Sequence, residues 1–190
     1  YAIMSANFKF VRAGYPIHTV IEAALAIVAE HEIPMDAITA VHVGMPANAM
    51  RVVDNRDMHS ICVQDMLSVA LLRGGLSLQQ EYFPEILSDP GFGPMRARIS
   101  VGVYPDLESD LPNGRWANVS ITTTRGQKHS TRLDWPRGHS QRGGVTWSDL
   151  SQKWHDGLPE LDVDRMIALG QRLEQLDDVS ELVREFRSPH

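Results

Sequence analysis

The side chains best suited to chemistry lie near the N-terminus of the chain. Lys9 and Arg12 precede Gly14 and Pro16, and His18 follows directly. Pro16 suits the first turn of a helix, because its missing N–H costs nothing there and its φ is already helical. A helix N-terminus attracts anions through its partial positive charge and its unpaired N–H groups. The pattern therefore indicates a carboxylate or phosphate site, against the alternative of solvated surface cations beside a capping histidine.

A helix must hold this site in place, and the sequence predicts one directly after Pro16. Apolar residues recur at helical spacing and form one stripe, which indicates that the helix packs against a core. The stripe consists of Ile17, Val20, Ile21, Ala24, Leu25 and Val28. Burial of the stripe would fix the direction in which the helix N-terminus points.

Composition bounds the class of protein. The 190 residues are 43% hydrophobic and 22% charged, which is ordinary for one globular domain over residues 1–190. The net charge of -6 argues against nucleic acid as the main partner, because phosphate binding needs a basic face. Cys62 stands alone, so no internal disulfide forms and a reducing, cytoplasmic location is expected. No apolar run is long enough for a membrane span, and the start at Tyr1 suggests a piece of a longer protein.

Periodicity predicts an α+β fold. Four runs alternate between apolar and polar residues, as half-buried strands do: 38–45, 98–104, 116–123 and 128–135. The last two flank a tight turn at 125–127 and should form a hairpin. Further helices are predicted over 61–73, from Thr146 to about His155, and from Asp162 onward. We expect an antiparallel sheet of about four strands with helices packed mainly on one face.

Two connecting segments carry little pattern. Residues 47–58 are predicted to be a polar loop. Residues 136–144 are rich in glycine and arginine, and without the spacing of a phosphate-binding loop they are predicted to be a flexible surface loop.

Several motifs, in order along the chain, resemble the second domain of the MmgE/PrpD family. They are Lys9 and His18 followed by the run EAALA, a buried helix that ends in a double glycine (60–75), the pair Asp89-Pro90, and a glycine-led loop with a helix that ends in lysine and an aromatic residue (138–154). The usual proline and aromatic residues between the lysine and the histidine are altered here. The family includes 2-methylcitrate dehydratase and cis-aconitate decarboxylase, which act on small polycarboxylates.

The resemblance implies that this chain forms half of an active-site cleft. The first, all-helical domain of the family is absent here and would be the partner, in the same precursor or in a companion chain. The resemblance also implies a homodimer and chemistry that needs no cofactor. The substrate would be a small di- or tricarboxylate.

The resemblance assigns roles to two residues, and their chemistry suits them. Lys9 would anchor a substrate carboxylate, or act as a base if desolvation lowers its pKa. His18 would donate to a carboxylate or transfer a proton near neutral pH. Arg12 is a further candidate for substrate binding, although a solvated loop cation is the alternative.

One departure from the family lies on the predicted helix over 61–73. Several members carry a substrate-facing tyrosine preceded by glutamine, and the corresponding residues here are Gln64, a candidate for substrate binding, and Asp65. An ionised aspartate accepts hydrogen bonds and does not donate them. Asp65 would serve as a base, pair with Lys9 or His18, or signal lost activity.

A metal site and a non-catalytic module are two further interpretations of the chain. His59, Cys62 and Asp65 lie three apart and could share a helix face, but zinc sites normally show more ligands, so no metal is expected.

The principal hypothesis is that the chain forms part of a dehydratase, decarboxylase or isomerase. The second is a non-catalytic binding or scaffold module on the same fold. Convergence of Lys9 and His18 on one cleft would favour the enzyme.

Overall fold

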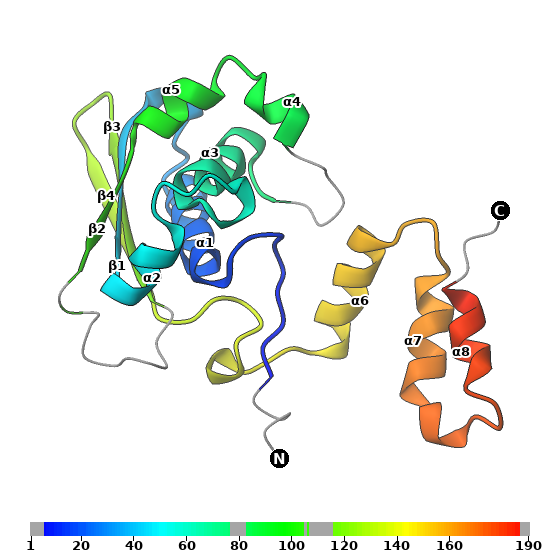
Figure 1. Cartoon of the computed structure of the whole chain (residues 1–190). Coiled ribbons are helices and arrows are strands. Elements are labelled where there is room, and N and C mark those ends of the chain that lie inside the picture. Colours follow the sequence, from blue (N-terminus) through cyan, green and yellow to red (C-terminus); the bar gives the residue numbers. More distant parts are fainter. Residues whose placement is uncertain (1–5, 77–82, 105, 107–115, 187–190) are drawn as a thin grey trace. The chain divides into compact units, whose positions relative to one another are not determined.

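The computed structural model describes residues 6–76, 83–104, 106 and 116–186. These residues form two compact units, the first within 6–144 and the second over 145–186 (Figure 1). The sequence indicates no boundary near residue 144. A compact unit need not fold on its own, so the single domain over residues 1–190 stays a prediction.

The first unit holds a sheet and the helices that pack with it. Its strands are β1 (Ile38–Met45), β2 (Ile99–Val103), β3 (Ala117–Thr123) and β4 (Lys128–Leu133). Its α-helices are α1 (Tyr15–Glu30), α2 (Ala47–Val53), α3 (Val63–Arg73), α4 (Phe83–Leu87) and α5 (Phe92–Ala97), and its 3-10 turns are η2 (Met35–Ala37), η3 (His59–Ile61) and η5 (Ser140–Arg142). All four strands agree with the predicted runs to within two residues at each end. The predicted polar loop over 47–58 is wrong at its start, where α2 forms.

The sheet is mixed, in the order β2-β1-β3-β4. β3 pairs antiparallel with both β1 and β4, so the predicted hairpin is confirmed. β1 and β2 are parallel, with Val41 opposite Ile99. An α+β fold with four strands is therefore confirmed, but the sheet is not antiparallel throughout. Alternation along a strand reports which residues are buried and carries no information about strand direction, so the parallel pair was not predicted.

The core of this unit forms where α1 meets the sheet. α1 contacts β3 and β4 along one side and α3 along the other (Figure 1). Four residues of the predicted stripe are fully buried, namely Ile17, Val20, Ile21 and Ala24, and Ile27 joins them, whereas Leu25 and Val28 are partly buried at its edge. Burial of this stripe fixes α1, and with it the position of the segment that precedes α1. That the helices lie mainly on one face of the sheet stays a prediction.

The second unit consists of short helices: α6 (Trp147–Gly157), α7 (Val163–Gln171), η6 (Leu173–Gln175) and α8 (Ser180–Glu185). The helix predicted from Thr146 is α6, and a capping box forms at its start, since Asp149 N donates to Thr146 Oγ1 at 3.1 Å and Thr146 N donates to Asp149 Oδ2 at 3.0 Å. Asp162 caps α7 through a bond from Arg165 N. Within the part of the chain that the structure describes, no helix is long and apolar enough to cross a bilayer.

Truncation of the α1 stripe should destabilise the first unit. Ile17→Ala removes a side chain that is 0% exposed, and the cavity left behind should lower the free energy of unfolding by about 3 kcal/mol. Urea unfolding measures this change. Val103→Ala, at a position that is 45% exposed, is the matched control and should change the stability by under about 0.5 kcal/mol. Equal effects at the two positions would contradict the assignment of α1 to the core.

Candidate functional site

The segment before α1 is tied to the body of the first unit. Gly14 N donates to Ser60 O in η3 at 2.7 Å, and a methyl group added at Gly14 would touch Ile61. Pro16 lies in the first turn of α1, as predicted, and no side chain caps that end of the helix. The loop between Lys9 and His18 therefore rests on the turn that leads into α3.

Lys9 and His18 converge on one backbone oxygen. Lys9 Nζ donates to Ala13 O at 3.2 Å, and His18 Nε2 lies 3.2 Å from the same oxygen. A carbonyl oxygen only accepts, so Nε2 of His18 must carry the proton and donate it. Two donors from opposite ends of the loop thus share a single acceptor, which holds the ammonium and the imidazole side by side.

His18 is neutral in this position. The side chain is buried, and burial lowers its pKa from 6.5 to about 4; the charge of Lys9 adds to the lowering, while the bond to Ala13 O opposes it. The positive charge expected at the start of α1 therefore resides on Lys9 and not on His18. The imidazole supplies an N–H donor at neutral pH without carrying charge.

A cavity of about 220 Å³ opens beside His18. Its polar lining comes from His18 and Glu22 of α1 and from Arg137 of the loop after β4, and most of its remaining wall is apolar. The guanidinium carbon of Arg137 lies 4.2 Å from the centre of the Phe10 ring, a cation–π distance. Lys9 is not part of the cavity wall. The cavity combines an imidazole, a carboxylate and a guanidinium in a small, largely apolar space.

The loop over 136–142 forms one wall of this cavity and is firmly attached to it. Phe8 N donates to Gly138 O at 2.9 Å, and Ser140 N donates to Asn7 Oδ1 at 2.9 Å. Arg142 Nη1 forms an ion pair with Glu22 Oε2 at 2.6 Å. The segment therefore has partners that the sequence did not predict, and its flexibility stays a prediction. Its partners lie more than a hundred positions away in the sequence, where no local pattern could reveal them.

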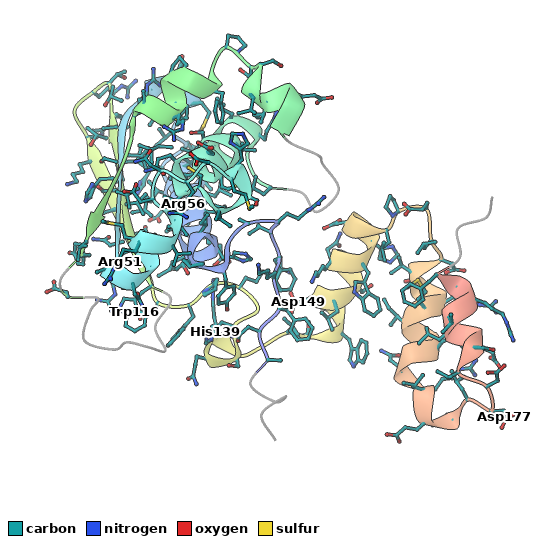
Figure 2. The ribbon with its side chains drawn as sticks, in the orientation of Figure 1. Arg51, Arg56, Trp116, His139, Asp149 and Asp177 are labelled. Atoms are coloured by element: carbon teal, nitrogen blue, oxygen red, sulfur yellow. The ribbon has the colours of Figure 1, made fainter. Side chains whose placement is uncertain are left out.

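An aromatic row supports the same loop. His139 is buried and stacks on Trp135 with 4.3 Å between ring centres, and Trp135 meets Trp116 edge to face at 5.6 Å. The Tyr15 ring, at the start of α1, lies 6.5 Å from His139 and 5.2 Å from His18. Figure 2 labels Trp116 and His139, two members of this row. Stacked rings thus connect the start of β3 to the start of α1 through the loop after β4.

Asp65 has partners other than the predicted ones. Its side chain is 5% exposed; Oδ2 lies 2.6 Å from His59 Nδ1, and Oδ1 accepts from Arg96 Nε at 2.6 Å. The hydrogen bond with Asp65 raises the pKa of Arg96 above its usual value. The structure pairs Asp65 with neither Lys9 nor His18. Its role in catalysis stays a prediction, and its contacts join η3, α3 and α5.

Gln64 is buried beside the turn after α2. Its Nε2 donates to Asp54 Oδ1 at 2.5 Å, and its Oε1 accepts from Asn55 N at 3.0 Å. These bonds hold the turn at Asn55, which has a φ of +45°. Arg12 is exposed on the loop before α1. Substrate binding by Gln64 and by Arg12 stays a prediction.

One of two comparisons relates the chain to known proteins. A family model described as the MmgE/PrpD C-terminal domain matches residues 12–174. The match includes His18, the helix α3 and the loop that lines the cavity, and it begins shortly after Lys9. A comparison with curated protein sequences found no match.

Acid should destabilise the protein through His18. The folded state lowers the pKa of His18 to about 4, so below pH 6.5 the unfolded chain takes up this proton more readily than the folded one. Stability present above pH 6.5 should be lost as the pH falls toward 4, by about 3 kcal/mol. Urea unfolding across this range measures the loss. His18→Gln keeps an N–H donor without titrating, so the same acid loss in that variant would exclude His18 as the cause.

Gly138 should tolerate no side chain. A Cβ at this position would lie 2.4 Å from Phe8 O, and the backbone is left-handed with a φ of +83°. Gly126 is a matched control, since its φ is +75° and nothing lies within 4 Å of an added Cβ. Both alanine variants should lose about 1 kcal/mol to the left-handed backbone. Gly138→Ala should lose about 2 kcal/mol more through the clash, as chemical unfolding would measure. Equal losses would show that Phe8 does not pack against Gly138.

Proposed function

Because the chain belongs to the MmgE/PrpD family, a family of dehydratase-like enzymes, we propose that it forms half of the active-site cleft of a lyase or isomerase. The proposed substrate is a small di- or tricarboxylate. Dehydration, decarboxylation and isomerisation of such acids would begin with the abstraction of a proton next to a carboxylate, followed by loss of water, loss of CO₂ or reprotonation. That step leaves negative charge of the enolate type, which the protein must stabilise.

One observation supports the proposal above the others: Lys9 Nζ and His18 Nε2 point at the same oxygen. A substrate carboxylate has two oxygens and would satisfy both donors at once, in place of the Ala13 carbonyl. The ammonium supplies the charge and the neutral imidazole supplies a directed N–H. Such a pair binds a carboxylate in one orientation.

The cavity beside His18 supplies a second cation. Arg137 lies on its wall, and a guanidinium binds a carboxylate through two parallel N–H groups. Lys9 and Arg137 together suit an acid with more than one carboxylate. The apolar remainder of the wall would exclude water, and exclusion of water strengthens each electrostatic contact with the substrate. The chemistry requires no cofactor.

We propose further that a helical domain, in the same precursor or in a companion chain, closes the cleft. It would supply the remaining groups that act on the substrate. A homodimer in the cytoplasm is the expected setting. Neither nucleic acid nor membrane is a proposed partner.

A non-catalytic binding or scaffold module is the second candidate. The observation that favours it is the engagement of Asp65, whose two oxygens are bonded to His59 and to Arg96 and to neither Lys9 nor His18. The shared acceptor of Lys9 and His18 favours the enzyme. Binding of carboxylates without turnover by the assembled protein would support the scaffold.

Citrate should stabilise the protein against heat in a manner that depends on Lys9. A ligand that binds only the folded state raises the midpoint of unfolding, and the stabilisation grows with the logarithm of the ligand concentration above the Kd. Lys9→Ala removes a charge-assisted hydrogen bond and should weaken citrate binding by about tenfold. Thermal unfolding at a series of citrate concentrations measures both effects.

Lys128→Ala is the matched control for this experiment. Lys128 is exposed on β4, so its loss changes the net charge equally without touching the loop before α1. The control should respond to citrate as the wild type does. Equal weakening of citrate binding by the two variants would show that net charge alone causes the effect. If citrate stabilised none of the three proteins, carboxylate binding would be contradicted.

A further inference from the structure

Most of the wall of the cavity beside His18 is apolar. Several parts of the first unit supply this lining: the segment before α1, α1 itself, and the segments that follow α3 and β4. The apolar residues are Phe10, Val11, Ile21, Leu25, Leu76 and Pro136, and the space measures about 220 Å³. A closed apolar cavity of about 150 Å³ can hold benzene, so the space suffices for a group of about six carbons.

The charges on the cavity wall favour an anion. Glu22 Oε2 accepts from Arg142 Nη1 at 2.6 Å and from Arg137 N at 2.9 Å, so two donors balance this carboxylate. His18 is neutral at neutral pH, whereas the Arg137 guanidinium is positively charged and lies against the Phe10 ring. The wall thus offers a cation for a carboxylate next to an apolar surface for hydrocarbon.

An apolar wall distinguishes between acids. A carboxylate or hydroxyl group placed against these side chains would lose its hydration without gaining a partner, which is unfavourable. Each methylene group removed from water there would instead tighten binding by about fourfold. An acid that consists only of carboxylate and hydroxyl groups therefore gains nothing from this part of the cavity, whereas an alkyl substituent does.

We propose that the acid held at Lys9 and His18 carries an apolar substituent of about four to six carbons, and that this substituent fills the cavity. The inference rests on the proposed function and narrows its substrate class, from any small di- or tricarboxylate to one with a hydrocarbon branch. The carboxylates bind at the donors of Lys9 and His18 and at Arg137. The branch packs against Ile21 and Leu25 on the α1 side of the cavity.

His18 connects the two parts of this binding mode. Its Nε2 lies 3.2 Å from the Ala13 oxygen that also accepts from Lys9, and the same residue forms part of the cavity wall. Phe10, the neighbour of Lys9 in the chain, lies on the wall as well. A branch attached close to the bound carboxylate is therefore the part of the acid nearest to the cavity.

Dicarboxylates that differ only in alkyl length test this binding mode in the full chain. Succinate, methylsuccinate, butylsuccinate and hexylsuccinate present the same two carboxylates, and calorimetric titration measures the Kd of each. The Kd of butylsuccinate should be at least about tenfold below that of methylsuccinate, and the gain should stop near hexylsuccinate, when the space is full. A Kd that stays constant along the series would leave the cavity to another occupant, such as an apolar side chain of the proposed helical domain, and would overturn the inference.

Variants on α1 test whether the gain comes from the cavity. Leu25 and Val28 are both partly buried at the edge of the core, and of the two it is Leu25 that lines the cavity. Leu25→Asn places an amide in the apolar wall and should reduce the preference for butylsuccinate over methylsuccinate by about fivefold. Leu25→Ala, a milder change, should reduce it in the same direction. Val28→Asn is the matched control and should keep the wild-type preference, so equal preferences at the two positions would overturn the inference.

Lys9→Ala separates this inference from the function beneath it. The variant should weaken the binding of succinate and of butylsuccinate alike, by about tenfold. Binding of succinate that depends on Lys9 but gains nothing from alkyl length would overturn the inference and leave the proposed function standing. Absence of binding by every acid in the series would contradict both, and so would a gain from alkyl length in binding that Lys9→Ala leaves unchanged.

Discussion

The carbonyl oxygen of Ala13 is the point on which the site depends. It accepts from Lys9 and lies equally close to His18 Nε2, so one side chain from the segment before α1 and one from α1 itself meet at this oxygen. The loop has no regular structure of its own and gains its shape from these contacts and from the bond to Ser60. Lys9 is an exposed residue, and its bond to Ala13 O directs its ammonium toward the loop.

The same oxygen explains why His18 differs from an ordinary histidine. The ring is buried together with Ile17 and Ile21, and its Nε2–H donates to the backbone oxygen of Ala13. Burial of a neutral, hydrogen-bonded imidazole costs little free energy, whereas burial of an imidazolium cation beside Lys9 would cost much more. The neutral state therefore follows from packing, and it assigns the positive charge of the site to Lys9 and, on the cavity wall, to Arg137.

A second layer of contacts surrounds this loop and makes the site rigid. On one side the segment 136–142 is joined to α1 by the Glu22 and Arg142 ion pair and by stacked rings. On the other side η3 is joined to α3 and α5 by Asp65. These two supports come from distant parts of the chain, and the first of them places Arg137 on the wall of the cavity beside His18. The polar groups of the site thus come from several elements of one compact unit.

The sequence by itself determined the features that depend on near neighbours. The α1 stripe, the β3 and β4 hairpin and the helix that starts at Thr146 all follow from residue types a few positions apart, because helix, turn and strand periodicities act over that range. Only the tertiary structure decided the parallel pairing of β1 with β2, the partners of Asp65, the attachment of the loop over 136–142 and the neutral state of His18. Each of these depends on groups that are far apart in sequence and on how deeply the fold buries them, and no local pattern encodes either quantity.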